Sequence, residues 1–309
     1  MATCRGCGRS LDQDATSCMD CGVVCDPAGL LAGQALGQRF LVEGPIAEGG
    51  QGQVLRATEI GSGRRAALKV AWPGASEGGP PTRALAREAR ALSLVDHPGV
   101  PALLGAGVEA DGTRWLAMAE VEGRELSQLL AEAGPFPERW VVAVGARLLS
   151  ALAAVHAAGL VHGDVTPANV LVDGHPGEPD GVSLIDFGLA GPAGEAAGAG
   201  EPLRLPGTPA YLGPERVRGA PADGRSDLYA VGVLLFELAT GVPPLRAATA
   251  AGLLARHLAE PPPRLRGRRP ELSAGLEAVV ARALEKEPAR RFADAQAMRQ
   301  ALLRCLPRG

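Results

Sequence analysis

The feature that constrains this chain most is a lysine inside an apolar strand. Lysine occurs only twice among the 31 basic residues, and Lys69 lies in the run Arg65-Ala66-Ala67-Leu68-Lys69-Val70, which is typical of a buried strand. An ammonium group in such a sheet needs an anionic partner. Glu88, in the helix predicted next, is the candidate. Alternatively, Glu88 belongs to a solvated helix face, because arginines stand beside it at positions 83, 87 and 90.

Length and charge limit the possible classes of protein. The 309 residues can bury a large core and form about two domains. A net charge of −3 gives no electrostatic case for binding nucleic acid or an anionic membrane. The most apolar stretches, 141–155 and 228–242, contain Arg147 and Glu237 and suit buried helices rather than membrane spans. With no apolar signal core near the start, we expect a soluble cytoplasmic protein without membrane insertion. Scarce lysine and abundant arginine and alanine are typical of GC-rich bacterial coding.

Residues 1–25 are dense in cysteine. Two Cys-x-x-Cys pairs, each followed by a glycine, are formed by Cys4, Cys7, Cys18 and Cys21. Such turns aim two thiolates at one ion, so two of them complete a tetrahedral Zn²⁺ site, and the segment resembles a zinc ribbon. Disulfides, redox-active cysteines or unrelated thiols are the alternatives, and the lack of an export signal disfavours disulfides. Cys25 and Cys305 are expected to be incidental.

The pattern changes after a short linker, residues 26–38. Strands are predicted at 40–46, 53–59, 65–71, 103–108 and 114–118, and a helix at 83–95. From Pro137 the chain is largely helical in pattern. A small antiparallel sheet with one helix, followed by a helical lobe, predicts a two-lobed α+β domain over residues 39–305. A ligand cleft between lobes is usual in such a fold.

A glycine-rich stretch precedes the lysine strand. Gly49 and Gly52 allow backbone amides to approach a phosphate group closely. Taken alone, the stretch fits an ordinary hairpin turn equally well, because the chain contains 42 glycines.

Polar residues far downstream complete the pattern. Asp164 and Asn169 lie five residues apart in one loop, so that a carboxylate and an amide can face one metal–phosphate site from two sides. Asp186-Phe187-Gly188 follows the apolar strand predicted at 182–185. A phosphate cradle, one cation, one base and two metal ligands are the parts needed for phosphoryl transfer from ATP.

The order and spacing of these motifs resemble the catalytic domain of the Hanks-type (eukaryotic-like) bacterial serine/threonine protein kinases over about residues 38 to 305. The resemblance implies that Lys69, paired with Glu88, aligns the α- and β-phosphates of ATP. It implies that Asp164 accepts the proton of a protein Ser or Thr hydroxyl, and that Asn169 and Asp186 bind Mg²⁺. The expected reaction transfers the γ-phosphoryl group of ATP to a protein substrate.

The resemblance also implies an adenine pocket. Ile46 and Val54 would roof the ring, Ala67 would leave space for it and Leu171 would form the floor. Met118 takes the gatekeeper position, and the segment from Ala119 through Glu120 to Val121 would offer backbone hydrogen bonds as the hinge. The residues expected to bind the nucleotide are Ile46, Gly49, Gly52, Val54, Ala67, Lys69, Met118, Glu120, Val121 and Leu171.

Three departures from the family pattern bear on catalytic activity. Ala47 replaces the first glycine, Gly163 the arginine of His-Arg-Asp, and Thr166 the lysine two residues after the base. These departures keep open the alternative of a pseudokinase, an ATP-binding scaffold with little phosphotransfer. A kinase of small molecules is disfavoured, because the activation segment continues through Gly207-Thr208-Pro209 to Glu215.

The activation segment and the residues after it carry further expectations. Residues 189–207 contain no Ser, Thr or Tyr, so activity is expected not to depend on phosphorylation there. Thr208 is expected to help position Asp164, Asp227 to tie down the loop around Asp164, and Arg291 to pair with Glu215. We also expect the cysteine segment, residues 1–25, to serve as a docking site for a protein partner.

Overall fold

The computed structural model describes residues 2–3, 10–11, 33–49, 52–71, 79–175, 178–194 and 207–306. The chain divides into two compact units, Met1–Ser93 with Ala102–Val121, and Leu94–Pro101 with Glu122–Gly309. The four cysteines of the predicted zinc site lie outside the described residues. Of the first 32 residues only two short strands are described, β1 (Ala2–Thr3) and β2 (Ser10–Leu11), which pair antiparallel.

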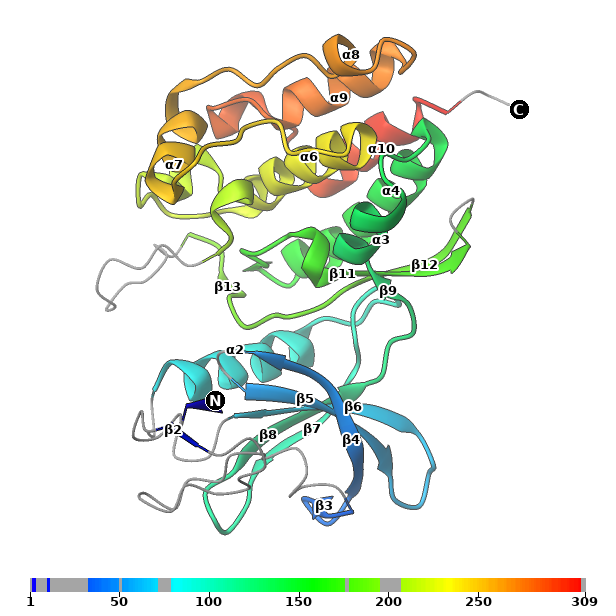
Figure 1. Ribbon diagram of the computed structural model, residues 1–309, viewed down its shortest axis with the longest axis vertical. Helices are drawn as coiled ribbons and strands as arrows, with labels where there is room; N and C mark the ends of the chain where they lie inside the picture. The colour runs from blue at the N-terminus through cyan, green and yellow to red at the C-terminus, as the bar shows by residue number, and fades with distance from the viewer. Residues whose placement is uncertain are drawn as a thin grey trace. The chain divides into compact units, whose positions relative to one another are not determined.

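The first unit is built on a six-stranded antiparallel sheet with the order β3-β4-β5-β6-β8-β7 (Figure 1). Its strands are β3 (Ala35–Leu36), β4 (Phe40–Gly49), β5 (Gly52–Glu59), β6 (Arg65–Ala71), β7 (Leu103–Val108) and β8 (Arg114–Ala119). The five strands predicted from apolar pattern are all present, and most of their ends agree within one residue. The exception is β4, which continues three residues past Ile46.

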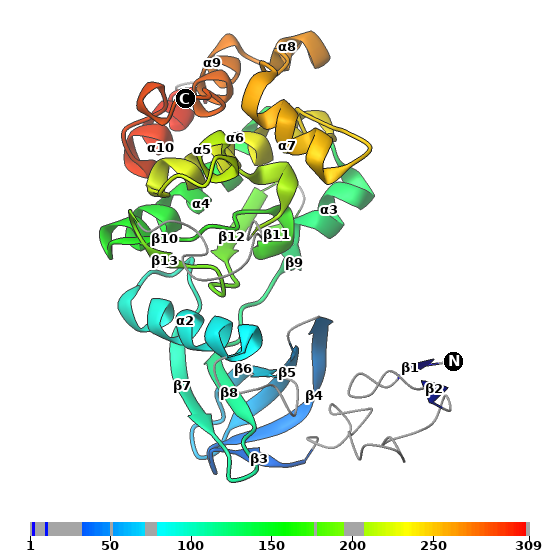
Figure 2. The ribbon, with the colours of Figure 1, turned by 90° about the vertical axis from the view of Figure 1, so that its left-hand side faces the viewer.

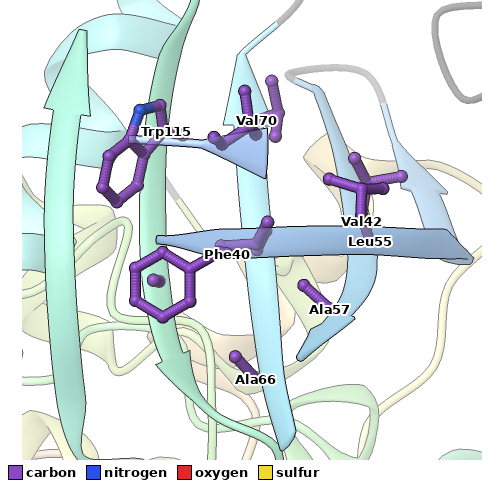
Figure 3. Close-up of a cluster of buried hydrophobic side chains, with 10 residues drawn as sticks. Phe40, Val42, Leu55, Ala57, Ala66, Val70 and Trp115 are labelled. Carbon is purple, nitrogen blue, oxygen red and sulfur yellow. The ribbon is translucent and has the colours of Figure 1, made fainter. Parts of the chain in front are cut away.

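Strict alternation on β5 decides which side chains face the core. Leu55 and Ala57 are fully buried, whereas Val54 between Gln53 and Leu55 is only half-buried on the opposite face. Figure 3 shows Leu55 and Ala57 beside Phe40 and Trp115, whose rings meet edge to face at 5.7 Å between centroids. Each fully buried side chain of this size contributes about 1.5–3 kcal/mol, so the core fixes the pairing register.

That register places the ATP-site candidates together. Val54 pairs with Lys69, and Ala67 pairs with Met118 on the neighbouring strand. On β6 the core face is occupied by Ala66, Leu68 and Val70. The face that carries Lys69 and Ala67 is therefore the face opposite the core.

Helix α2 (Pro80–Leu94) belongs to the first unit, apart from its last residue. The sequence predicts this helix at 83–95. Its buried face includes Ala84, Leu85, Ala91 and Leu92, and the same face carries Glu88, which is only 1% exposed. The arginines at positions 83, 87 and 90 are exposed.

The second unit is mainly helical (Figure 2). Its helices are α3 (Leu126–Ala133), α4 (Glu138–Ala157), α5 (Pro214–Val217), α6 (Gly224–Thr240), α7 (Ala250–Ala259), α8 (Leu265–Arg268), α9 (Ala274–Ala283) and α10 (Ala295–Leu303). The two most apolar stretches form α4 and α6, and most of their residues are buried, as predicted. Among the described residues, α4 is long and apolar enough to cross a membrane. Buried core helices have the same length and composition, so this is weak evidence for a membrane span.

Two small sheets interrupt the helices, and they position the polar loop. One has the order β12-β11-β9, from β9 (Arg124–Glu125), β11 (Val170–His175) and β12 (Glu178–Leu184). The other pairs β10 (Leu160–Val161) with β13 (Gly191–Pro192). Of these five strands the sequence predicted only the end of β12; β9, β10 and β13 have two residues each and pair with distant segments.

Candidate active site

The predicted ion pair between Lys69 and Glu88 is present. Lys69 Nζ lies 2.7 Å from Glu88 Oε2, and the two side chains are 20% and 1% exposed. The alternative of a solvated helix face is therefore wrong for Glu88. An ammonium group held in this way, on the face of β6 opposite the core, is oriented by a buried carboxylate rather than by solvent.

The glycine-rich hairpin has one position that admits only glycine. A Cβ atom at Gly52 would lie 2.1 Å from the carbonyl oxygen of Val70. Strand pairing alone therefore explains this glycine, whatever it offers to a ligand. At Ala47, the departure from the family pattern, the backbone φ is not positive: among described non-glycine residues only Gln38 and Asp186 have a positive φ. Alanine is accommodated there without strain. The Ile46 side chain beside it is 44% exposed.

Glu120 has a role that the sequence did not indicate. Its carboxylate forms ion pairs with Arg56 at 2.9 Å and with Arg65 at 2.8 Å. Its backbone N–H donates to the carbonyl oxygen of Arg65 at 3.3 Å. Glu120 is thus tied to β5 and β6 of the first unit's sheet, which fixes the direction in which the chain enters Val121.

Asp164 is held by three donors. Its Oδ1 accepts from the backbone N–H of Thr208 at 3.0 Å and from the Thr208 hydroxyl at 3.1 Å. Its Oδ2 accepts from Asn169 Nδ2 at 3.0 Å. The positioning role expected of Thr208 thus corresponds to two direct hydrogen bonds, and the carboxylate has one defined orientation.

Asn169 and Asp186 fit a magnesium ion by the chemistry of their donors. Asn169 Nδ2 also donates to the backbone oxygen of Asp164, at 2.9 Å. Because the amide is planar, its oxygen faces away from Asp164 and suits a hard cation. Asp186 has φ +60°, a conformation that costs an aspartate about 1–3 kcal/mol and that is typical of functional sites. Among the described residues no group of three or more His, Cys, Asp or Glu side chains is arranged so that it could hold a metal ion.

His162 supports this loop as a neutral ring. Its Nε2 lies 3.2 Å from the carbonyl oxygen of Ile185, and its Nδ1 accepts from the backbone N–H of Asp164 at 3.3 Å. Burial lowers the pKa of His162, although the charges of three nearby carboxylates oppose the shift. The two hydrogen bonds require the tautomer protonated on Nε2. The ring also packs edge to face against Phe187, at 4.7 Å.

Asp227 anchors the same loop from α6. Its carboxylate accepts from the backbone N–H groups of His162 and Gly163 and from His156 Nε2, all at 2.9 Å. Burial raises the pKa of Asp227, but the hydrogen bonds from His156 and from the backbone N–H of Gly163 lower it by more, so the pKa lies below its ordinary value. The second predicted anchor is also present: Arg291 pairs bidentately with Glu215, at 2.8 and 2.7 Å.

A cavity of about 410 Å³ lies within the second unit, beside Thr208, which donates to Asp164. Its lining includes Thr166, Thr208, Tyr211 and Glu237. The Tyr211 hydroxyl donates to Glu237, and burial raises the pKa values of both groups. Thr166, the replacement for the family's lysine, is 4% exposed, so no cation projects from this position.

Comparison with known proteins identifies the family of this chain. The sequence pattern of the protein kinase domain matches residues 40–303. This chain belongs to the protein kinase domain family. The chain is 38% identical over 280 residues to serine/threonine-protein kinase pkn3 of Myxococcus xanthus, covering 87% of this chain and 50% of that protein. It is 38% identical over 264 residues to PknL of Mycobacterium tuberculosis, with coverages of 85% and 64%. For PknJ of Mycobacterium bovis the identity is 36% over 258 residues, with coverages of 83% and 43%. The chain thus spans half to two thirds of the length of the first two relatives.

Proposed function

We propose that this chain is an ATP-dependent serine/threonine protein kinase of bacterial signalling. The observation that carries the proposal is the Asp164 carboxylate, held by Thr208 on one oxygen and by Asn169 on the other. A base oriented by three donors, in a loop anchored to a core helix, suits proton acceptance from a hydroxyl. The relatives' names, which all say serine/threonine-protein kinase, support the substrate class.

In the proposed reaction the hydroxyl oxygen of a protein Ser or Thr attacks the γ-phosphorus of ATP. The bond from the γ-phosphorus to the bridging oxygen breaks, ADP leaves with that electron pair, and the hydroxyl proton passes to Asp164. Lys69, oriented by Glu88, holds the α- and β-phosphates. Asn169 and Asp186 would hold Mg²⁺, which would neutralise charge on the phosphates when bound. The donor is ATP, so we place the reaction in the cytoplasm.

The adenine ring is assigned to the face of the first unit's sheet that carries Ala67 and Val54. The backbone of Gly49 and Gly52 would lie over the phosphates, with Ile46 and Val54 above the ring and Met118 behind it. Val121 would supply a hinge hydrogen bond, because the N–H of Glu120 is used by Arg65. Leu171, on β11, is assigned to the floor.

The test is phosphotransfer by the purified full chain. Wild type, Asp164→Asn and Lys69→Ala are incubated with labelled ATP, Mg²⁺ and a generic protein substrate, and nucleotide binding is measured in parallel. Asp164→Asn should lower the rate by about 100-fold or more while ATP affinity stays nearly unchanged. Equal background rates in all three proteins would instead support the alternative of an ATP-binding pseudokinase.

We also propose that Cys4, Cys7, Cys18 and Cys21 bind one structural Zn²⁺ as a zinc ribbon, and that the ribbon is a docking site for a protein partner. Four thiols at this spacing support the proposal. Elemental analysis should find one zinc per chain, and chelation should leave the unfolding transition of the kinase domain in place. Absence of zinc, with these cysteines oxidised in protein purified from its own host, would refute it.

A further inference from the structure

Arg216 occupies the space that a side chain at position 163 would need. It lies in the short helix α5 and is 6% exposed. A Cβ atom built on Gly163 would be 3.2 Å from Arg216 Nη1 and 3.2 Å from the carbonyl oxygen of Leu189. Gly163 also has φ +81°, in the left-handed region that favours glycine. The catalytic loop, residues 162–169, therefore has a guanidinium group packed directly against its backbone.

The surroundings of this guanidinium are acidic and tightly packed. Arg216 borders a cavity of about 10 Å³, no larger than one water position, together with Asp164, Thr208 and Asp227. The two aspartates are the carboxylates that hold the loop and form its proposed base. A guanidinium keeps its charge under all physiological conditions, and burying it so deeply is favourable only beside anionic groups.

The neighbouring arginine shows that burial is specific to one position. Arg218, two residues further along the chain, is exposed. Within α5, Arg216 directly follows Glu215, which Arg291 anchors in the core. Arg216 therefore projects from a fixed point onto the loop.

We infer that Arg216 is a positioning residue for the proposed phosphoryl transfer: it supplies from α5 the cation that lies against the catalytic loop, and glycine at position 163 leaves room for it. The inference rests on the proposed function. Arg216 acts through the loop that carries Asp164 and is not assigned a contact with either substrate. The two positions should consequently be coupled, because a side chain at position 163 would compete with Arg216 for the same space.

The experiment is a double-mutant cycle on the full chain. Arg216→Gln should lower kcat by about tenfold or more, with KM for ATP within about twofold of wild type, because the phosphate-binding groups are untouched. Gly163→Arg should be at least as damaging, because a side chain is strained at φ +81° and the new one also meets Arg216. The double variant Gly163→Arg/Arg216→Gln should be more active than Gly163→Arg alone. Arg218→Gln, the matched exposed control, should retain wild-type kcat.

A second comparison does not depend on the folding of Gly163→Arg. Arg216→Lys keeps the charge and should retain more activity than Arg216→Gln, with both unfolding midpoints measured in urea. The role of Arg216 is overturned if the activity losses of the two single variants simply multiply in the double variant. It is also overturned if Arg216→Gln is as active as Arg218→Gln. Either result would leave the kinase proposal intact. Background activity of the wild type would instead refute the proposed function, and this role with it.

Discussion

Replacing Thr208 by valine isolates one of the hydrogen bonds that orient Asp164. Valine has nearly the same shape as threonine but no hydroxyl, so the variant loses the bond of 3.1 Å from Thr208 Oγ1 and keeps the backbone bond of 3.0 Å. Asn169 Nδ2 still holds the other carboxylate oxygen. The carboxylate should remain near its place but rotate more freely.

The size of the effect follows from these contacts. A hydrogen bond to a charged acceptor contributes about 1.5–3 kcal/mol. Thr208 is exposed, so water partly replaces the lost donor and the lower end applies. Since each 1.36 kcal/mol in the barrier is a factor of ten, kcat should fall about tenfold. KM for ATP should not change, because Thr208 has no assigned contact with the nucleotide.

Steady-state phosphotransfer with the same protein substrate measures this effect. Thr208→Ser keeps the hydroxyl and should stay within about threefold of wild type. Thr208→Asp places a second carboxylate against Asp164 and should be the least active of the three variants, because like charges repel at this distance. A valine variant as active as wild type would refute the reasoning, and so would a serine variant as weak as valine.

Three further predictions address other parts of the chain. Glu88→Gln should lower kcat/KM for ATP by about tenfold or more, because Lys69 loses its buried counter-ion; Arg87→Gln on the exposed face of α2 is the control. Arg291→Met should cost about 3–5 kcal/mol in urea unfolding, because it leaves the carboxylate of Glu215 buried and unpaired. Burial lowers the pKa of His257 to about 4 from its ordinary 6.5, so its folded form takes up a proton less readily than its unfolded form. The free energy of unfolding of the wild type should therefore fall as the pH drops from 6.5 to about 4. Over this range it should fall by about 3 kcal/mol more than that of His257→Gln; parallel pH profiles of the two proteins would contradict this.

The strands of the first unit could be predicted because a local rule determines them. On β5 every second residue from Gln53 to Glu59 is buried, and such alternation is visible in the sequence itself. The pair between Lys69 and Glu88 was predictable for a similar reason, since a buried ammonium group must find a carboxylate. The short strands of the second unit were not predictable, because β9 pairs with β11 across more than 40 residues of chain.

The finer parts of the site depend on three-dimensional packing. Nothing in the sequence Pro214-Glu215-Arg216-Val217-Arg218 shows that its first arginine is buried and its second exposed. The positive φ of Asp186 and the network around Asp227 also arise from distant elements meeting. The adenine-site assignments came from family resemblance, and each of these side chains alone would pass for ordinary core or surface.

Because lysine is so scarce, Lys69 makes this chain simple to label chemically at one site. Amine-directed reagents find only two lysine side chains in the whole sequence besides the terminal amine. The side-chain nitrogen of Lys286 is buried, which shields it from reagents. This holds even though burial lowers the pKa of Lys286 to about 8. Lys69 is 20% exposed and held at 2.7 Å from Glu88. An acyl-phosphate derivative of ATP would therefore acylate essentially one side chain, and the mass of one tryptic peptide would report nucleotide-site occupancy directly in a crude extract.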